Sequence, residues 1–543
     1  MSQANPTPSS APATALGSRS QASVSVMSPP AVAVGAAHWS QADFAAAAGR
    51  LAGKLTAWGV RAGDVVLRPA DDPMGVLCLQ HALVLVGAGL LPYPAGLPSA
   101  HVDALAAAVG AEWRWGQHAP ASTGRGAAAD CRGATAPSLL IRTSGSEGAP
   151  KVAMLTAAQL AASATRVNGT LDLQPGDEWL CVLPLHHIGG LAIGWRCALA
   201  GATLRLVAAD GPAGEAAPTE SGAERAGAGA CIFTEPARAA ARTDFDACAL
   251  AATLARYPVT HLSLVPAMLS RLLEAMPAPP PRLRVLLLGG QALHPALARR
   301  AVAAGWPLFV SYGMSETGSM VAVRRWRDDA APGSLVGPLL PDVQADCAGP
   351  GEPPRRLRLR GPMLMAGYAD ARRRPGLGLG DGWLTTSDLC RVEADGSLRV
   401  FARADDLVVI GGEQVSPAAV EARLAAAPGV VEAAVVAVTH PHWGATLAAC
   451  WRGPAAAPAL EAWCRAELPS RERPRLFRRL AALPLLASGK PDRAALKRLV
   501  EGPDAANAGA PGSGEPFGGE SLNAESRSDS LHAEQAPGPP SAD

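Results

Sequence analysis

The sequence lacks the features that mark membrane proteins and nucleic-acid-binding proteins. It holds 48 Lys and Arg against 47 Asp and Glu, a formal net charge of +1, so no basic field exists to attract nucleic acid or an anionic membrane. The longest apolar stretch, residues 76–92, contains Gln80, His81 and two glycines, which favours a buried helix followed by a strand over a transmembrane helix. We therefore expect neither nucleic-acid binding nor stable membrane insertion.

The chain also lacks the cysteine spacing of a disulfide framework or a zinc site. Its ten cysteines are scattered, and no Cys-x-x-Cys pair occurs. Cys181 and Cys450 lie in apolar, strand-like runs, which is typical of reduced, buried thiols. The N-terminal segment shows no basic-then-apolar signal pattern. These features favour a cytoplasmic protein.

Three segments have the composition of unstructured chain. The ends at 1–34 and 502–543 are rich in Ser, Pro, Gly and Ala, and we expect both to be disordered tails. Residues 210–242 are similar and lie inside the folded region, which predicts a mobile surface insertion.

Between these segments the chain predicts two domains, since 543 residues exceed the usual size of one core. Up to residue 404, strand-like apolar runs alternate with helical ones, which predicts a large α/β domain at 35–404 with mostly parallel sheets flanked by helices. The pattern then changes to that of a smaller α+β unit, at 405–501.

The loop at residues 143–151 is the strongest local indication of a nucleotide site. Apolar runs at 139–142 and 152–155 bracket it as predicted strands. Small hydroxyl residues and glycines let backbone N–H groups face a phosphate, and a lysine adds a point charge. It is not a Walker A loop, because Pro150 and Val152 stand where that motif has Gly and Ser or Thr. Taken alone, it also fits a Gly/Ser hairpin with a solvated lysine. The candidate phosphate ligands are Thr143, Ser144, Gly145, Ser146, Gly148 and Lys151.

Further motifs follow in a fixed order. They are Ser-Tyr-Gly-Met-Ser-Glu-Thr at 311–317, Gly-Trp-Leu-Thr-Thr-Ser-Asp at 382–388, Phe-Ala-Arg-Ala-Asp-Asp at 401–406 running on to Gly-Gly-Glu at 411–413, and Ser-Gly-Lys at 488–490. The series resembles the acyl-adenylate-forming superfamily of acyl-CoA synthetases, peptide-synthetase adenylation domains and luciferases, from about Gln41 to Val500. The resemblance implies a large N-terminal domain, a small mobile C-terminal domain, and an acid–CoA ligase that uses ATP, Mg²⁺ and coenzyme A.

The resemblance assigns one group of residues to the phosphates. The 143–151 loop would grip pyrophosphate, and Glu316 would bind the Mg²⁺ that bridges the phosphates. Ser315 would offer its hydroxyl to the α-phosphate. Glu147 departs from the family pattern, and because a carboxylate beside phosphates is unfavourable we expect it to point outward.

A second group is assigned to the nucleoside. The backbone of Gly289, Gly290 and Gln291 would line the purine, and Tyr312, followed by Gly313, would lie near the adenine. Asp388 would accept both ribose hydroxyls, and Arg403 would make a second contact to ribose or phosphate. A plain ion pair at a domain surface is the other interpretation of Asp388 and Arg403.

The third group serves the domain movement that the family uses for its two half-reactions. Asp405 matches the hinge. In the first half-reaction Lys490 would reach the carboxylate and the α-phosphate and stabilise developing negative charge. In the second, Gly411 and Gly412 would face the site and let the backbone approach coenzyme A.

The segment at 183–196, with 262–273, looks most like the o-succinylbenzoate–CoA ligases of menaquinone synthesis. His187 matches a pocket histidine between the acyl site and the CoA tunnel, with a core histidine as the alternative. Since that substrate keeps a second, unreacted carboxylate, a cation should hold it, and Arg196 is the candidate. A structural arginine is the alternative.

Other functions stay open at this stage. The acid can be an aryl or fatty acid, the enzyme can load a carrier protein, or the chain can be a nucleotide-binding relative without catalysis. The presence of Glu316, Asp388, Arg403 and Lys490 together argues against the last. The small-molecule acid is the expected partner, and a homodimer is an open expectation because many enzymes of this size form one.

Overall fold

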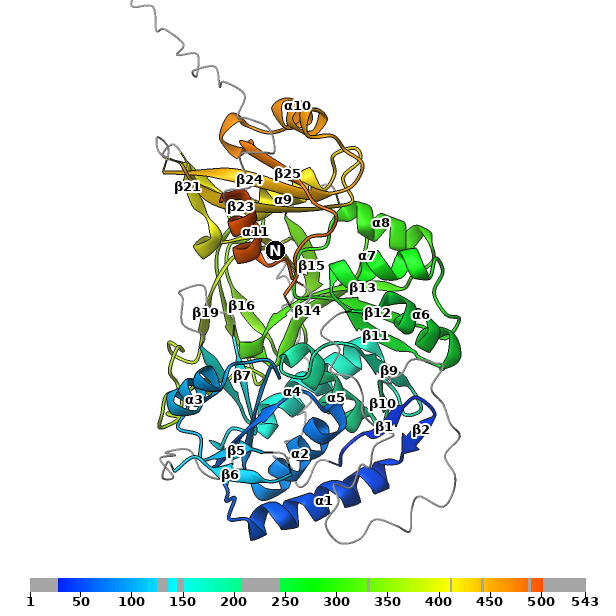
Figure 1. The fold of residues 1–543 in the computed structure, drawn as a ribbon, viewed down its shortest axis with the longest axis vertical. Helices are drawn as coiled ribbons and strands as arrows, with labels where there is room; N and C mark the ends of the chain where they lie inside the picture. The colour runs from blue at the N-terminus through cyan, green and yellow to red at the C-terminus, as the bar shows by residue number, and fades with distance from the viewer. Residues whose placement is uncertain are drawn as a thin grey trace, which may run out of the picture.

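The computed structural model describes residues 28–501 apart from gaps at 117, 125–134, 144–150, 208–244, 330–332, 411–412, 441–443 and 487–489. In this part of the chain the fold is α/β, with a large N-terminal domain and a small C-terminal one above it in Figure 1. No helix among the described residues is both long and apolar enough to cross a membrane.

The largest sheet has eight strands in the order β14-β13-β12-β11-β9-β10-β1-β2. The central strands from β13 to β1 are parallel, and β14 and β2 pair antiparallel at the edges. Its strands, in chain order, are β1 (Ala31–Val34), β2 (Ala37–Trp39), β9 (Glu178–Cys181), β10 (Thr203–Leu206), β11 (His261–Leu264), β12 (Val285–Leu288), β13 (Leu308–Met314) and β14 (Ser319–Arg325).

A second sheet has seven strands in the order β18-β8-β7-β4-β3-β5-β6. Its members are β3 (Val65–Pro69), β4 (Gly89–Tyr93), β5 (Trp113–Trp115), β6 (Pro120–Ser122), β7 (Leu139–Arg142), β8 (Val152–Leu155) and β18 (Gly367–Tyr368). The two predicted strands, β7 and β8, form an antiparallel pair with Arg142 opposite Val152, and so bring the two ends of the 143–151 loop together.

A five-stranded antiparallel sheet completes the large domain, in the order β15-β20-β19-β17-β16. It consists of β15 (Ser334–Pro338), β16 (Gln344–Asp346), β17 (Arg355–Arg360), β19 (Leu384–Val392) and β20 (Ser397–Arg403).

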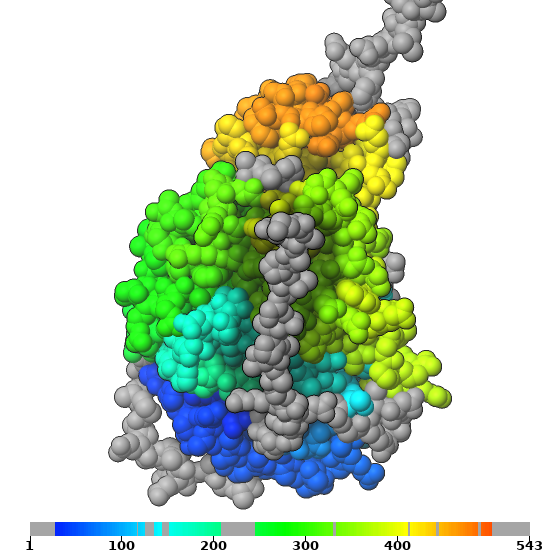
Figure 2. All heavy atoms as spheres, turned by 180° about the vertical axis from the view of Figure 1, so that it is seen from behind, coloured from blue at the N-terminus to red at the C-terminus, as the bar shows by residue number. Residues whose placement is uncertain are grey.

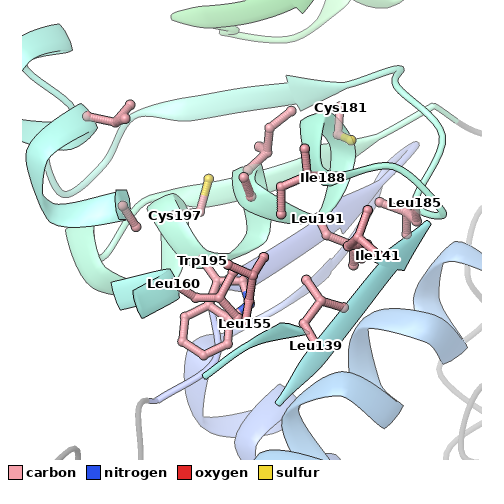
Figure 3. Close-up of a cluster of buried hydrophobic side chains, with 14 of the residues drawn as sticks. Leu139, Ile141, Leu155, Leu160, Cys181, Leu185, Ile188, Leu191, Trp195 and Cys197 are labelled. Atoms are coloured by element: carbon pink, nitrogen blue, oxygen red, sulfur yellow. The ribbon is translucent and has the colours of Figure 1, made fainter. Parts of the chain in front are cut away.

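The helices of the large domain supply the apolar faces that cover the sheets. They are α1 (Gln41–Ala57), α2 (Pro73–Val86), α3 (Ser99–Ala108), α4 (Ala157–Leu171), α5 (Ile188–Ala200), α6 (Ala247–Arg256), α7 (Pro266–Ala275) and α8 (Pro295–Ala303). Helix α5 is buried along most of its length, and Figure 3 shows its Ile188, Leu191 and Trp195 gathered with Ile141 of β7 and Leu155 of β8. Burying such side chains is the main stabilising contribution to the core, about 1.5–3 kcal/mol for each large aliphatic one.

The small domain has its own core around a three-stranded sheet, in the order β23-β24-β25. Its elements are β21 (Val408–Ile410), β22 (Glu413–Val415), α9 (Pro417–Leu424), β23 (Glu432–His440), β24 (Gly444–Arg452), α10 (Ala457–Glu467), β25 (Leu476–Arg479) and α11 (Arg493–Glu501). Figure 2 shows this domain, in yellow and orange, seated over the green part of the large domain.

Local sequence signals set several of these boundaries. Thr156 caps α4 and forms a capping box, in which Thr156 N–H donates to Gln159 Oε1 at 2.9 Å and Gln159 N–H donates to Thr156 Oγ1 at 3.3 Å. Ser416 caps α9, and Pro417 stands at its first position, where a proline is favoured. Helix α2 followed by β4 confirms the prediction for residues 76–92, and the thiols of Cys181 and Cys450 are free and buried as expected.

The N-terminal boundary at residue 34 is wrong. Ala31–Val34 forms β1 and pairs in parallel with β10, so ordered chain begins before the predicted end of the tail. The segment is short and follows a Ser- and Pro-rich stretch, so composition alone hides the strand. Residues 1–27, 502–543 and all of 210–242 lie outside the described part, and the other domain boundaries stay predictions.

Candidate functional site

The site lies where the parallel strands of the largest sheet end, as is usual in α/β folds. Strand β12 ends at Leu288 and runs into Gly289 and Gly290, whose φ of +77° favours glycine. Strand β13 carries Tyr312 and Gly313, and a Cβ on Gly313 would lie 2.2 Å from the Ser319 carbonyl oxygen. The turn at Gly290 and the close strand contact at Gly313 therefore both require glycine.

The residues predicted for the nucleoside come together. The Tyr312 hydroxyl donates to Oδ2 of Asp388 at 2.5 Å, although the two residues lie on different sheets. Asp388 is opposite Arg403 in the β19–β20 register, and its Oδ1 is 4.0 Å from the Arg403 Nε. Burial and the neighbouring Asp388 charge raise the pKa of Tyr312 well above its usual value, so the phenol stays a donor. Gln291 follows this turn, ahead of α8.

Lys490 reaches the same place from the small domain. Its Cε lies 3.9 Å from the position that a Cβ on Gly290 would occupy. Burial and the positive charge of Arg403 lower the pKa of Lys490, while Asp388 opposes that shift. The loop that carries Lys490 is held by its carbonyl, which accepts from the Leu486 N–H at 2.7 Å.

Two adjacent histidines stand near this lysine. His186 and His187 lie in the turn before α5 with ring centroids 4.3 Å apart. Burial lowers the pKa of each to about 4, and the charge of Lys490 adds to the shift of His187. Both rings are therefore neutral near pH 7. The positive charge of Arg142, at the end of β7, also contributes to lowering both pKa values.

The residues predicted to contact the phosphates lie around Glu316. It lies in the short 3₁₀ helix Ser315–Thr317 between β13 and β14, and its Oε1 accepts from the Tyr368 hydroxyl at 2.8 Å. The ammonium of Lys151 lies 5.5 Å from the centroid of the Tyr368 ring. The two ends of the 143–151 loop are joined by a hydrogen bond, in which the Thr143 N–H donates to the Lys151 carbonyl at 2.8 Å.

We tested whether these residues fit a magnesium ion. No cluster of three or more His, Cys, Asp or Glu side chains suited to a metal occurs among the described residues. Within the same part of the chain, Oε2 of Glu316 accepts no hydrogen bond, whereas Oε1 is bound by Tyr368. One carboxylate oxygen free to join phosphate oxygens and waters is a usual set for Mg²⁺, so Glu316 fits the role.

The predicted hinge is held by neighbouring strands. Asp405 lies in a short 3₁₀ helix, Ala404–Asp406, directly after β20. It accepts a hydrogen bond from the Ser387 hydroxyl, and its Oδ1 lies 3.4 Å from a terminal nitrogen of Arg356. The small domain starts beyond this anchored point.

The small domain also touches the large one away from the hinge. A terminal nitrogen of Arg452 on β24 lies 3.5 Å from Oε1 of Glu274 on α7. His294, which caps α8, bonds the backbone of Ala422 in α9. With these contacts between the domains formed, Lys490 lies next to Gly290.

Among the described residues, Arg196 makes no hydrogen bond or ion pair with another predicted site residue. It is only 2% exposed in α5, donates to the Ser319 hydroxyl at 2.6 Å, and lies 5.0 Å from the centroid of the Trp179 ring. Burial lowers the pKa of Arg196 to about 10. Within the described residues no carboxylate pairs with it. Its Nε is buried and makes no hydrogen bond within the described part of the chain, and a buried cation without a paired anion is costly.

Some predicted residues lie outside the described part of the chain, and others were missed. Ser144, Gly145, Ser146, Glu147, Gly148, Gly411 and Gly412 fall in the gaps. Tyr368 and Arg142 were not singled out from sequence. The Gly-Tyr pair at 367–368 carried no recognised signal, and Arg142 was read only as the end of a strand.

Comparison with known proteins gives the family context. The sequence profile described as AMP-binding enzyme matches residues 112–219 and 226–369, and that of its C-terminal domain matches 419–490. The chain is 30% identical over 371 residues to a 2-succinylbenzoate--CoA ligase from Bacillus mycoides, covering 67% of this chain and 70% of the relative. The corresponding figures for the Bacillus licheniformis ligase are 32% over 361 residues, 65% and 68%.

Solved structures share the fold. A variant of E. coli MenE with bound OSB-AMS superposes with a TM-score of 0.68 at 26% identity, over 87% of this chain and 95% of that one. The Bacillus subtilis enzyme in complex with ATP and magnesium ion gives 0.69 at 24%, over 86% and 96%. ATP-bound MatB from Rhodopseudomonas palustris gives 0.70 at 23%, over 88% and 97%. The last two support the architecture alone.

Proposed function

The chain belongs to the AMP-binding enzyme family, as an AMP-forming acid–CoA ligase, and from that premise we propose that it converts o-succinylbenzoate to its CoA thioester in menaquinone biosynthesis. The main observation behind this proposal is that Tyr312, Asp388 and Lys490 lie close to one another. A nucleoside-binding pair and a mobile cation there suit attack on an α-phosphate. The substrate is inferred from the curated relatives, which are 2-succinylbenzoate--CoA ligases.

The proposed first half-reaction joins the acid to AMP. A carboxylate oxygen attacks the α-phosphorus of ATP, the bond from that phosphorus to the bridging oxygen breaks, and pyrophosphate leaves. Asp388 and Arg403 hold the ribose, and Lys490 stabilises the negative charge that develops between carboxylate and phosphate. Glu316 would hold Mg²⁺, which when bound neutralises phosphate charge. The loop from Thr143 to Lys151 would grip the leaving pyrophosphate.

The proposed second half-reaction forms the thioester. The coenzyme A sulfur attacks the acyl carbon, the bond from that carbon to the AMP oxygen breaks, and AMP leaves while the thiol gives up its proton. Rotation about Asp405 would withdraw Lys490 and bring Gly411 and Gly412 to the site. His187, neutral near pH 7, would line the path between the acyl group and coenzyme A.

We propose Arg196 as the cation for the second carboxylate of the acid. The support is its buried charge without a carboxylate partner in the described residues, on the helix that directly follows His187. The hydroxyl of Ser319, which it now contacts, is a neutral group that a carboxylate can join or replace.

Pyrophosphate release with ATP, Mg²⁺ and a panel of acids, each with and without coenzyme A, tests this function. We expect turnover that depends on coenzyme A, with o-succinylbenzoate far ahead of benzoates and fatty acids. A preference for a monocarboxylic acid would keep the ligase and reject the substrate. ATP binding without pyrophosphate release from any acid would reject catalysis.

A further inference from the structure

Tyr368 connects two residues that were assigned separately to the phosphates. Its hydroxyl donates to Glu316 Oε1 at 2.8 Å, and its ring faces the ammonium of Lys151 at 5.5 Å from the centroid. The three residues come from separate parts of the fold: Tyr368 lies in β18, Glu316 in the short helix after β13, and Lys151 directly before β8. One side chain thus touches both the carboxylate and the lysine of the phosphate side.

The backbone around Tyr368 is fixed on both sides. Tyr368 pairs with Ala153 in the β18–β8 register, and its N–H donates to the Leu377 carbonyl at 2.8 Å. The same segment reaches Glu316, because the Met365 N–H donates to the Glu316 carbonyl at 2.7 Å. The ring and the carboxylate are therefore carried by directly linked backbone.

The ring of Tyr368 packs closely against Gly378. A Cβ at Gly378 would lie 2.4 Å from Cδ2 and 2.6 Å from Cε2 of Tyr368, and Gly378 has a φ of +84°, which favours glycine. No other residue type fits this position without moving the ring. The face toward Lys151 and the hydroxyl toward Glu316 are thereby held in one orientation.

We propose that Tyr368 is a positioning residue that fixes the Glu316 carboxylate for a divalent cation and aligns it with Lys151 across the phosphate site. This inference rests on the proposed ATP and Mg²⁺ role of the site. With Oε1 occupied by the hydroxyl, the carboxylate presents Oε2 to the cation without free rotation. Fixing a ligand in advance lowers the entropy that metal binding costs.

The Tyr368 hydroxyl is a neutral donor to the Glu316 carboxylate. Because the hydroxyl has no charge of its own, it orients the carboxylate without competing with the cation for it.

The test is the affinity for ATP measured by calorimetry on the full chain, once with Mg²⁺ and once with EDTA. For Tyr368→Phe, which keeps the ring beside Lys151, we expect about tenfold weaker binding with Mg²⁺, the loss of one hydrogen bond to a charged group, and nearly unchanged binding in EDTA. Tyr257→Phe is the matched control, since that tyrosine ends α6 beneath Arg205.

A double-mutant cycle separates positioning from general damage. In a Glu316→Gln background, Tyr368→Phe should weaken Mg·ATP binding no further, because the carboxylate it orients is gone. Equal weakening with Mg²⁺ and EDTA, full additivity with Glu316→Gln, or no change at all would each overturn the proposal. A wild-type chain that binds ATP equally well with Mg²⁺ and EDTA would instead reject the metal role of Glu316 before any variant is considered.

Discussion

The Tyr312 hydroxyl lies 2.5 Å from Oδ2 of Asp388, and this hydrogen bond ties the eight-stranded sheet to the five-stranded one at the nucleotide site. Asp388 is 8% exposed and also sits 4.0 Å from Arg403. Oδ2 of Asp388 accepts from Tyr312, and Oδ1 is the oxygen nearer Arg403. We propose that Tyr312 orients Asp388 for a ribose hydroxyl.

Removing this hydroxyl should weaken ATP binding. We expect Tyr312→Phe to raise the KM for ATP about tenfold, the cost of one hydrogen bond to a carboxylate, with little change in the KM for the acid. Steady-state kinetics with each substrate varied in turn measures this, and Tyr257→Phe serves as control. An unchanged KM for ATP would show that the bond does not position Asp388.

Lys490 should matter for only one of the two half-reactions. We expect Lys490→Ala to lower pyrophosphate formation roughly 100- to 1,000-fold, as for other groups that stabilise transition-state charge. Thioester formation from synthetic acyl-adenylate and coenzyme A should stay close to the wild-type rate. Lys497→Ala, which removes a half-exposed lysine on α11, is the control. Equal losses in both half-reactions would contradict the assigned role.

The contact between Glu274 and Arg452 should favour the domain orientation seen here. Both side chains are partly exposed and 3.5 Å apart, so the pair contributes at most about 1 kcal/mol. We expect Glu274→Ala to slow adenylation up to about fivefold and to leave or speed thioester formation. Glu461→Ala is the matched control, because its partner Arg465 lies on the same helix. Slowing of thioester formation alone would reverse the interpretation.

Arg196 should discriminate between acids rather than support catalysis in general. We expect Arg196→Leu to raise the KM for o-succinylbenzoate at least about tenfold relative to that for benzoate, and Arg196→Lys to restore part of the difference. The ratio of the two KM values is the readout, because loss of stability would lower activity with both acids. An unchanged ratio would assign Arg196 a purely structural role with Ser319 and Trp179.

His81 should give the fold a measurable dependence on pH. It is 4% exposed, its ring meets that of Phe44 edge-on, and burial lowers its pKa to about 4. The unfolded chain, with a histidine pKa of about 6.5, binds the extra proton between pH 4 and 6.5, so the free energy of unfolding falls as the pH falls through that window.

Replacing His81 should make the free energy of unfolding depend less on pH. We expect His81→Leu to reduce the slope of unfolding free energy against pH, between pH 5 and 6, by roughly 1 kcal/mol per pH unit. Urea unfolding at several pH values measures it. His101→Leu changes an exposed side chain on α3 and serves as control. An identical slope for His81→Leu and wild type would show that His81 is not buried as a neutral ring.

Local signals predicted much of this fold, and failed where contacts between distant segments decide. The apolar runs at 139–142 and 152–155 placed β7 and β8 correctly. The strand-like run that contains Cys181 forms β9, which begins at the charged Glu178 because pairing with its neighbours, rather than the apolar run, sets its ends. A short strand such as β1 is stabilised only by a partner far along the chain.

The same limit holds for the site. Motifs resembling a known family pointed to Tyr312, Asp388 and Lys490, and the structure brings them together. The bond between Tyr368 and Glu316 spans 52 residues and depends on how β18 lies against β8, so no local pattern reveals it. The burial of Arg196 without a carboxylate partner in the described residues likewise appears only when α5 is packed against its neighbours.

The proposed acyl-adenylate intermediate is tested most sharply by following one oxygen atom of the acid's carboxylate. We would label o-succinylbenzoate with ¹⁸O in its carboxylates and incubate it with ATP, Mg²⁺ and coenzyme A. We expect mass spectrometry to show AMP that carries one ¹⁸O, together with the CoA thioester. That label can reach AMP only through an acyl-adenylate. Thioester formed with unlabelled AMP, or with ADP as the nucleotide product, would exclude the acyl-adenylate intermediate.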